Sequence, residues 1–251
     1  MTFEDKAILV TGSTRGIGEA TAKAFVDLGA RVAVNGRTAD SVDRAIARLG
    51  ATKRLVPAPG SVATPESCAA VVDKAMSGLG GLDVLVNNAG VYAIASIEAS
   101  DEALWDKILD TNLKGTFYCT RAPLPALRAA KGNVVNVASV AGLVGFPGTA
   151  VYCAAKGAVV NLTRALALEG APEVRVNCVC PSVVETEMGR LNLDPAKEAA
   201  EARRALEATK PLKRIAAPEE VAAAVVYLAS ADARYITGTA LTMDGGMTAG
   251  G

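Results

Sequence analysis

Short apolar runs alternate with segments of helical spacing along almost the whole chain, and this alternation constrains the fold most. Seven such runs lie at residues 6–12, 30–36, 53–59, 82–90, 132–139, 174–181 and 239–246. Continuous apolar runs are typical of strands that are covered on both faces, and strands separated by helices form right-handed crossovers in a parallel sheet. The sequence therefore predicts one doubly wound α/β domain over residues 1–251, with a parallel sheet of about seven strands flanked by helices.

Charge and composition exclude several kinds of function. Lysine and arginine total 26, as do aspartate and glutamate, so a net charge of zero gives no reason to expect nucleic acid or an anionic membrane as a partner. The absence of histidine excludes Ser-His and Cys-His nucleophiles and histidine zinc sites, and we expect no metal. Five cysteines without a C-x-x-C pattern argue against a disulfide framework. With no apolar run of about 18 residues, we expect a cytoplasmic protein.

A glycine-rich turn follows the first apolar run. In "TGSTRGIG" the glycines are Gly12, Gly16 and Gly18, spaced G-x-x-x-G-x-G. Glycines between a strand and a helix allow a tight turn and let backbone N–H groups approach a pyrophosphate at the positive helix end. We therefore predict a dinucleotide site, the alternative being a tight turn that binds nothing.

The end of the second run bears on which dinucleotide binds. An acidic residue there accepts from the ribose hydroxyl of NAD, whereas an arginine accommodates the extra phosphate of NADP. Here Asn35 and Gly36 stand in the acid's place, Arg37 follows, and Arg15 lies in the glycine turn. Two guanidiniums without a carboxylate favour a phosphate, so we predict NADP(H) as the preferred cofactor, with NAD(H) possible. Two solvated surface arginines are the alternative.

Tyr152 and Lys156 lie four residues apart in an otherwise small and apolar helical segment. That spacing places both side chains on one helix face. A free phenol has a pKa of about 10, and a neighbouring ammonium is expected to lower it. The pair is thus a candidate acid–base centre, although a buried tyrosine is also an ordinary core residue.

Together these segments resemble the short-chain dehydrogenase/reductase family over essentially the whole chain. The resemblance is carried by "TGSTRGIG", "NNAG" at 87–90, Asn112, Ser139, "YCAAK", "CPSVVET" and "DGG". It implies a Rossmann-type fold and reversible NAD(P)(H)-dependent reduction of a ketone to a secondary alcohol. It further implies that Tyr152 exchanges a proton with the carbonyl oxygen, that Ser139 binds this oxygen, and that Lys156 also holds the nicotinamide ribose. Asn112 would order a water in a proton relay.

The same resemblance, with the two arginines, assigns the cofactor contacts. They are Gly12, Ser13, Thr14, Arg15, Gly16, Ile17, Gly18, Arg37, Ser61, Val62, Asn88, Ala89, Gly90, Tyr152, Lys156, Pro181, Val184 and Thr186. Two positions depart from the family pattern. Ser61 stands where an aspartate toward the adenine is common, and Ser182 stands where a glycine follows the proline.

The substrate side is less clearly marked. We expect a mobile helical lid over residues 187–213 and pocket walls at 91–94 and 143–148, with Ser139, Tyr152, Tyr92, Val144 and Phe146 as substrate contacts. These walls suit a small-molecule carbonyl or alcohol with an apolar or small aliphatic body. Similarity to small-diol dehydrogenases around "YCAAKGAVVNLTRA" and "DGGMTA" points to acetoin or butanediol-like substrates.

Two other functions stay open. One is reduction of 3-oxoacyl groups on an acyl carrier protein, for which Arg121, Arg128 and Lys131 would form a basic patch unless they are only solvated helix charges. The other is a regulator that binds NADPH without turnover, since a fold does not fix a function. Family members of this size are usually dimers or tetramers. A homotetramer or homodimer is therefore expected here, and alanine-rich faces at 119–130 and 153–168 allow it.

Overall fold

Seven parallel strands form one sheet in the order β3-β2-β1-β4-β5-β6-β7. The computed structural model describes residues 1–50, 53–193 and 196–250. The strands are β1 Ala7–Val10, β2 Arg31–Val34, β3 Leu55–Pro57, β4 Val84–Asn87, β5 Asn133–Val137, β6 Arg175–Pro181 and β7 Ala240–Met243. The predicted single α/β domain with a seven-stranded parallel sheet is confirmed.

The strand order reverses at β1, and this places the binding crevice. The chain runs outward from β1 to β2 and β3, then returns to β4 on the other side of β1. Val10 at the end of β1 pairs with Val34 and with Val86, so the carboxyl ends of three strands lie side by side. Ligands of such sheets bind outside the carboxyl ends of the strands, at the point where the order reverses.

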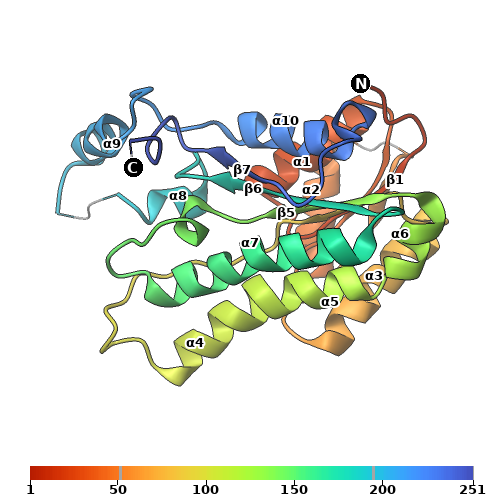
Figure 1. Cartoon of the computed structure of the whole chain (residues 1–251), viewed down its shortest axis with the longest axis horizontal. Coiled ribbons are helices and arrows are strands. Elements are labelled where there is room, and N and C mark those ends of the chain that lie inside the picture. The colour runs from red at the N-terminus through yellow and green to blue at the C-terminus, as the bar shows by residue number, and fades with distance from the viewer. Residues whose placement is uncertain (51–52, 194–195, 251) are drawn as a thin grey trace.

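Helices cover both faces of the sheet (Figure 1). Helices α1 Gly16–Asp27, α2 Ala39–Leu49 and α10 Pro218–Ala229 lie on one face. The other face carries α3 Pro65–Leu79, α4 Glu102–Leu109, α5 Gly115–Arg121, α6 Leu124–Ala130 and α7 Ala150–Gly170. Within the described ranges no helix is long and apolar enough to cross a bilayer.

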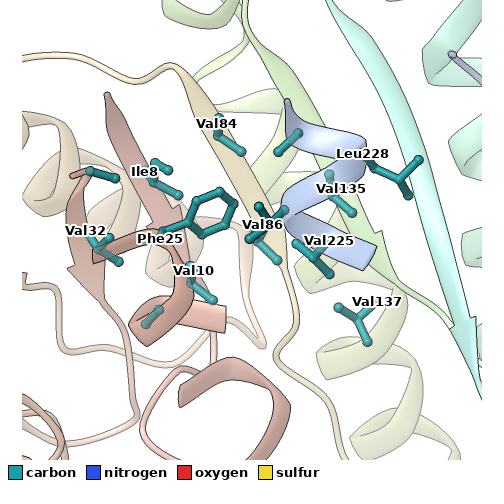
Figure 2. Close-up of a cluster of buried hydrophobic side chains, with 14 of the residues drawn as sticks. Ile8, Val10, Phe25, Val32, Val84, Val86, Val135, Val137, Val225 and Leu228 are labelled. Atoms are coloured by element: carbon teal, nitrogen blue, oxygen red, sulfur yellow. The ribbon is translucent and has the colours of Figure 1, made fainter. Parts of the chain in front are cut away.

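Each face has its own apolar core. Figure 2 shows the first, in which Phe25 of α1 and Val225 of α10 pack over Val10 and Val86 of the sheet. Neighbouring strand residues point the opposite way, and Leu9 packs with α3 on the second face. Because both faces are buried, the strands are continuously apolar, as the sequence indicated.

Residues 101–130 form a helical region that is not a regular α-helix throughout. α4 continues through a π-helical turn, Asp110–Lys114, directly into α5, and α6 begins after Pro123. The wide turn inserts one extra residue into the helix, and single π turns of this kind often occur at functional sites. Asn112 lies in it.

The expected lid region contains two helices. α8 Glu187–Arg190 begins just after β6, and α9 Ala199–Ala208 follows; residues 194–195 between them lie outside the described part. Two 3₁₀ turns, Val140–Gly142 and Ala231–Ala233, complete the described elements.

Candidate active site

One cavity of about 1190 Å³ opens at the carboxyl ends of the strands. It brings together most residues that the sequence singled out, although they come from nearly the whole chain. Those that line it are Gly12, Thr14, Arg15, Gly16, Ile17, Gly18, Arg37, Ser61, Asn88, Ala89, Gly90, Tyr92, Ser139, Phe146, Tyr152, Lys156, Pro181, Val184 and Thr186. This volume is large enough for a dinucleotide together with a small molecule.

Four of the predicted residues do not line this cavity. Ser13 is buried, and its hydroxyl donates to the Val10 carbonyl, so it stabilises the glycine turn from inside the protein. Val62 packs in a small core with Cys68. Val144 is 41% exposed and lies outside the lining. Asn112, the fourth, is fully buried.

The amide of Asn112 is occupied by the backbone of the segment that follows β4. Its Oδ1 accepts from the Val91 N–H at 2.8 Å, and its Nδ2 donates to the Val91 carbonyl at 2.9 Å. This double hydrogen bond fixes the chain beside Gly90, which lines the cavity. The contact explains an asparagine inside a helix. The water relay implied by the family resemblance stays a prediction.

The N-terminus of α1 faces the cavity without a side-chain cap. Its N-cap residue, Arg15, makes no capping hydrogen bond, whereas Thr38 and Thr64 cap α2 and α3 with reciprocal capping boxes. Gly16 and Gly18 of the first turn line the cavity. Uncapped N–H groups at a positive helix end are what a pyrophosphate would use, so the turn fits the dinucleotide that the sequence predicts.

Asn35, which stands in place of the NAD-selective acid, has a structural task. Its Oδ1 accepts from the Gly12 N–H at 3.0 Å, and its Nδ2 donates to the carbonyls of Ala58 and Gly60 at 2.8 and 3.1 Å. The side chain thereby ties the glycine turn to the segment after β3. A carboxylate in this place could not donate to those two carbonyls.

Three arginines surround this end of the cavity, one more than sequence reasoning identified. Arg37 is exposed and forms no ion pair among the described residues. Arg15 reaches across the cavity to Glu187 of α8. Arg48 was missed because it lies in the last turn of α2 and belongs to no motif. It donates to the Thr14 carbonyl at 2.7 Å and forms an ion pair with Glu19 at 2.8 Å.

Tyr152, Ser139 and Lys156 converge at the middle of the cavity. Lys156 donates to the Val137 carbonyl at 2.8 Å, and its Nζ lies 5.7 Å from the centre of the Tyr152 ring. The Ser139 hydroxyl accepts from the Ala141 N–H at 3.1 Å and lies close enough to Tyr152 to affect the pKa of the phenol. The Tyr92 ring packs edge-on against Tyr152, with 4.9 Å between ring centres. A hydroxyl pair and a buried ammonium thus share one end of the fifth strand.

The pKa of Tyr152 differs from the expectation that Lys156 lowers it. Burial raises this pKa to about 12, the Ser139 hydroxyl opposes the rise, and Tyr92 and Cys153 add to it. Burial also lowers the pKa of Lys156 to about 8. Removal from water disfavours both charged forms, and this effect outweighs the attraction between them. The phenol is therefore protonated at neutral pH.

The shifted pKa of Lys156 predicts a stability that rises with pH. Its ammonium has a pKa of about 8 when folded and about 10.4 when unfolded. Between these values the unfolded chain binds more protons, so raising the pH favours folding. From pH 7.5 to pH 9.5, the gain in unfolding free energy should be about 2 kcal/mol larger in wild type than in Lys156→Met. Urea titrations at both pH values measure it, and equal gains would contradict the shift.

Among the described residues, no group of three or more cysteine and acidic side chains is placed to hold a metal.

The fold and the cavity define a dinucleotide-binding α/β protein with a hydroxyl–ammonium site. A family model described as enoyl-(acyl carrier protein) reductase matches residues 12–248. The chain belongs to the short-chain dehydrogenase/reductase family.

The similar proteins include dehydrogenases named for an alcohol, a diol and a sugar. The 2-(S)-hydroxypropyl-CoM dehydrogenase 3 of Xanthobacter autotrophicus is 41% identical over 253 residues, covering 98% of each chain. The meso-2,3-butanediol dehydrogenase of Serratia marcescens is also 41% identical, over 99% of this chain and 97% of its own. The ligand-free structure of aldohexose dehydrogenase from Thermoplasma acidophilum superposes with a TM-score of 0.87 at 33% identity, covering 98% of this chain and 95% of that chain. The chain is accordingly an NAD(P)-dependent alcohol/ketone oxidoreductase by family.

Proposed function

We propose that this protein reversibly reduces a ketone to a secondary alcohol with NADP(H), and that Tyr152 is its general acid and base. The main observation in support is that Tyr152, Ser139 and Lys156 line the same cavity as the uncapped N-terminus of α1. The dehydrogenases to which the chain is similar support the same reaction class.

The side chains present would divide the reaction as follows. A bound nicotinamide cofactor supplies the hydride that reaches the carbonyl carbon. The Tyr152 hydroxyl donates its proton to the carbonyl oxygen, and Ser139 donates a hydrogen bond to that oxygen. Tyr152 is protonated at neutral pH, as reduction requires. As the phenolate forms, the nearby Lys156 ammonium stabilises its negative charge. In oxidation the phenolate takes the proton back from the alcohol.

NADP(H) is proposed over NAD(H) because arginines line the adenosine end of the cavity. Arg15 and Arg48 are paired with Glu187 and Glu19, whereas Arg37 has no carboxylate partner among the described residues. Arg15, Arg37 and Arg48 line it, and the position of the NAD-selective acid is held by the amide of Asn35. Guanidiniums bind phosphate through paired hydrogen bonds. Arg37 is the one best placed for this, being exposed and unpaired within the described residues.

The proposed substrate is a small-molecule ketone or secondary alcohol, bound under α8 and α9 as a lid. Tyr92 and Phe146 line the cavity near Tyr152, and Met188 and Asn192 of the lid region face it. The Tyr92 hydroxyl donates to Asn192 at 2.9 Å, which joins one wall to the lid. The likeness to meso-2,3-butanediol dehydrogenase keeps acetoin and butanediol in the test panel.

Reduction of carrier-bound 3-oxoacyl groups is the less favoured function. Arg121, Arg128 and Lys131 lie at the ends of α5 and α6, just before β5 begins at Asn133. They are thus at the amino ends of the strands, whereas the cavity opens at the carboxyl ends. Within one chain, this patch does not border the cavity.

Assembly and location complete the proposal. We propose a cytoplasmic homodimer or homotetramer. Trp105 and Phe117, which are 49% and 39% exposed, give α4 and α5 an apolar outer surface that a second copy would cover.

A spectrophotometric screen tests the function directly. Purified protein is assayed with NADPH and with NADH against acetoin, butanedione, 2-butanone and longer ketones, and in reverse against the alcohols. Absorbance loss at the nicotinamide band with a ketone, faster with NADPH, is the expected result. Binding of NADPH without oxidation by any ketone would favour the regulator, and activity only with carrier-bound 3-oxoacyl groups would favour the carrier-protein reductase.

A further inference from the structure

Lys210 is a second buried lysine in the cavity, and the proposed reaction does not use it. Among the described residues only Lys156 and Lys210 are buried lysines, with 5% and 2% of their surface exposed. Both line the same cavity. Lysine is almost never fully buried unless it has a partner, so the position of Lys210 calls for one.

The described part of the chain does not supply an anionic partner for Lys210. Its Nζ donates to the Thr209 hydroxyl at 2.8 Å, and no carboxylate lies within 4.0 Å of it among the described residues. Asp244, the acid whose charge acts on Lys210, forms its hydrogen bonds with other groups. Its Oδ1 accepts from the Gly246 N–H at 2.9 Å, and its Oδ2 accepts from the N–H and hydroxyl of Thr248 at 2.8 and 2.6 Å.

The surroundings hold Lys210 in this place. The segment after α9 lies beside the C-terminal segment (Figure 1), and the Leu212 N–H donates to the Gly245 carbonyl at 3.1 Å. Burial lowers the pKa of Lys210, and the charge of Asp244 opposes the shift. An ammonium that keeps only one neutral hydroxyl as a partner has lost much of its hydration. An anion entering the cavity would restore its missing partner.

We propose that Lys210 binds an anionic group of the substrate, so that the preferred substrate is an oxo acid or hydroxy acid carrying a carboxylate or sulfonate. This rests on the proposed function of the site. Tyr152 and Lys210 lie on different elements, α7 and the segment after α9, and both line the cavity. The substrate therefore places its carbonyl at Tyr152 and its anion at Lys210. Neutral ketones of the same length are turned over less efficiently.

Matched acids and esters test this assignment. The probes are 4-oxopentanoate, 5-oxohexanoate and their methyl esters, assayed with NADPH in wild type, Lys210→Met, Lys210→Arg and Lys74→Met. Lys74 is the control because it is an exposed lysine on α3 with a single hydrogen bond, to the Pro59 carbonyl, and it does not line the cavity.

We expect the acid to exceed its ester in kcat/KM in wild type and in Lys74→Met. Lys210→Met should lower kcat/KM for the better acid about 30-fold, the effect of removing one partner of a buried charge pair, and leave the ester within about threefold. The loss should be mainly in KM, because Lys210 does not touch the reacting atoms. Lys210→Arg should keep a preference for the acid. Equal losses for acid and ester would overturn the assignment and make Lys210 a structural residue.

A binding measurement separates this inference from the proposed function. The melting temperature of each NADP⁺-loaded variant is measured with and without 5-oxohexanoate. If 5-oxohexanoate raises the melting temperature of wild type but not of Lys210→Met, the anion site is supported. This holds even if no ketone is reduced, and then only the proposed reaction fails. Ketone reduction with no discrimination between acid and ester, and no stabilisation by the acid, refutes the anion site and leaves the reaction standing.

Discussion

Replacing Tyr152 with phenylalanine should lower kcat for ketone reduction by about 1000-fold, the usual scale of general acid catalysis. The change removes one hydroxyl and keeps the ring, so its edge-on contact with Tyr92 is preserved. The Lys156 hydrogen bond to Val137 is likewise unaffected. NADPH affinity, measured by fluorescence titration, should therefore change little while turnover falls.

Tyr118→Phe is the matched control. Tyr118 is also a partly buried tyrosine, but its ring packs against Phe117 and it does not line the cavity. This variant should keep wild-type kcat. Near-normal turnover in Tyr152→Phe would remove Tyr152 from the reaction and send the search for a proton donor back to Ser139.

Arg37→Glu should change the choice of cofactor. A carboxylate at this exposed position repels a phosphate and accepts from a ribose hydroxyl. We expect the ratio of kcat/KM for NADPH to that for NADH to fall about 100-fold, since like charges brought together cost several kcal/mol. Steady-state kinetics with each nucleotide at saturating ketone measures the ratio.

Arg44→Glu provides the comparison, because it makes the same charge change on α2 outside the cavity lining. It should leave the nucleotide ratio nearly unchanged. A ratio that is equally insensitive to Arg37→Glu would show that the phosphate, if bound, is held by Arg15 and Arg48. Asn35→Asp is a poor choice for this switch, because it would remove the donor to Ala58 and Gly60.

Much of the fold could be predicted because its signals are local. Continuous apolar runs such as Ile8–Val10 and Val84–Val86 become strands buried on both faces, and each glycine or polar residue after them falls at a strand end. Parallel strands bring their carboxyl ends to one edge of the sheet. The residues that directly follow each strand in the sequence therefore predict much of the cavity lining. The π turn at Asn112 was not foreseen, because no composition signal marks one inserted residue in a helix.

The electrostatics of the site could not be predicted from spacing alone. Four residues of separation correctly place Tyr152 and Lys156 on one helix face, but the sign of the pKa shift depends on how deeply both groups are buried. Burial is set by residues from β5, β6 and the 3₁₀ turn after β5. Lys210 and Arg48 were overlooked for a related reason: each lies in a charged, ordinary-looking segment, and only tertiary folding carries it to the cavity.

The ion pair between Arg15 and Glu187 joins the glycine turn to α8. A phosphate that engages Arg15 would compete with the Glu187 carboxylate for the guanidinium donors, and this competition would weaken the link between the glycine turn and α8 beside the substrate compartment. Entry of the first ligand would then set how readily the second is admitted. Reciprocity of linked equilibria requires the converse as well: a substrate that holds α8 down changes the affinity for the nucleotide by the same factor.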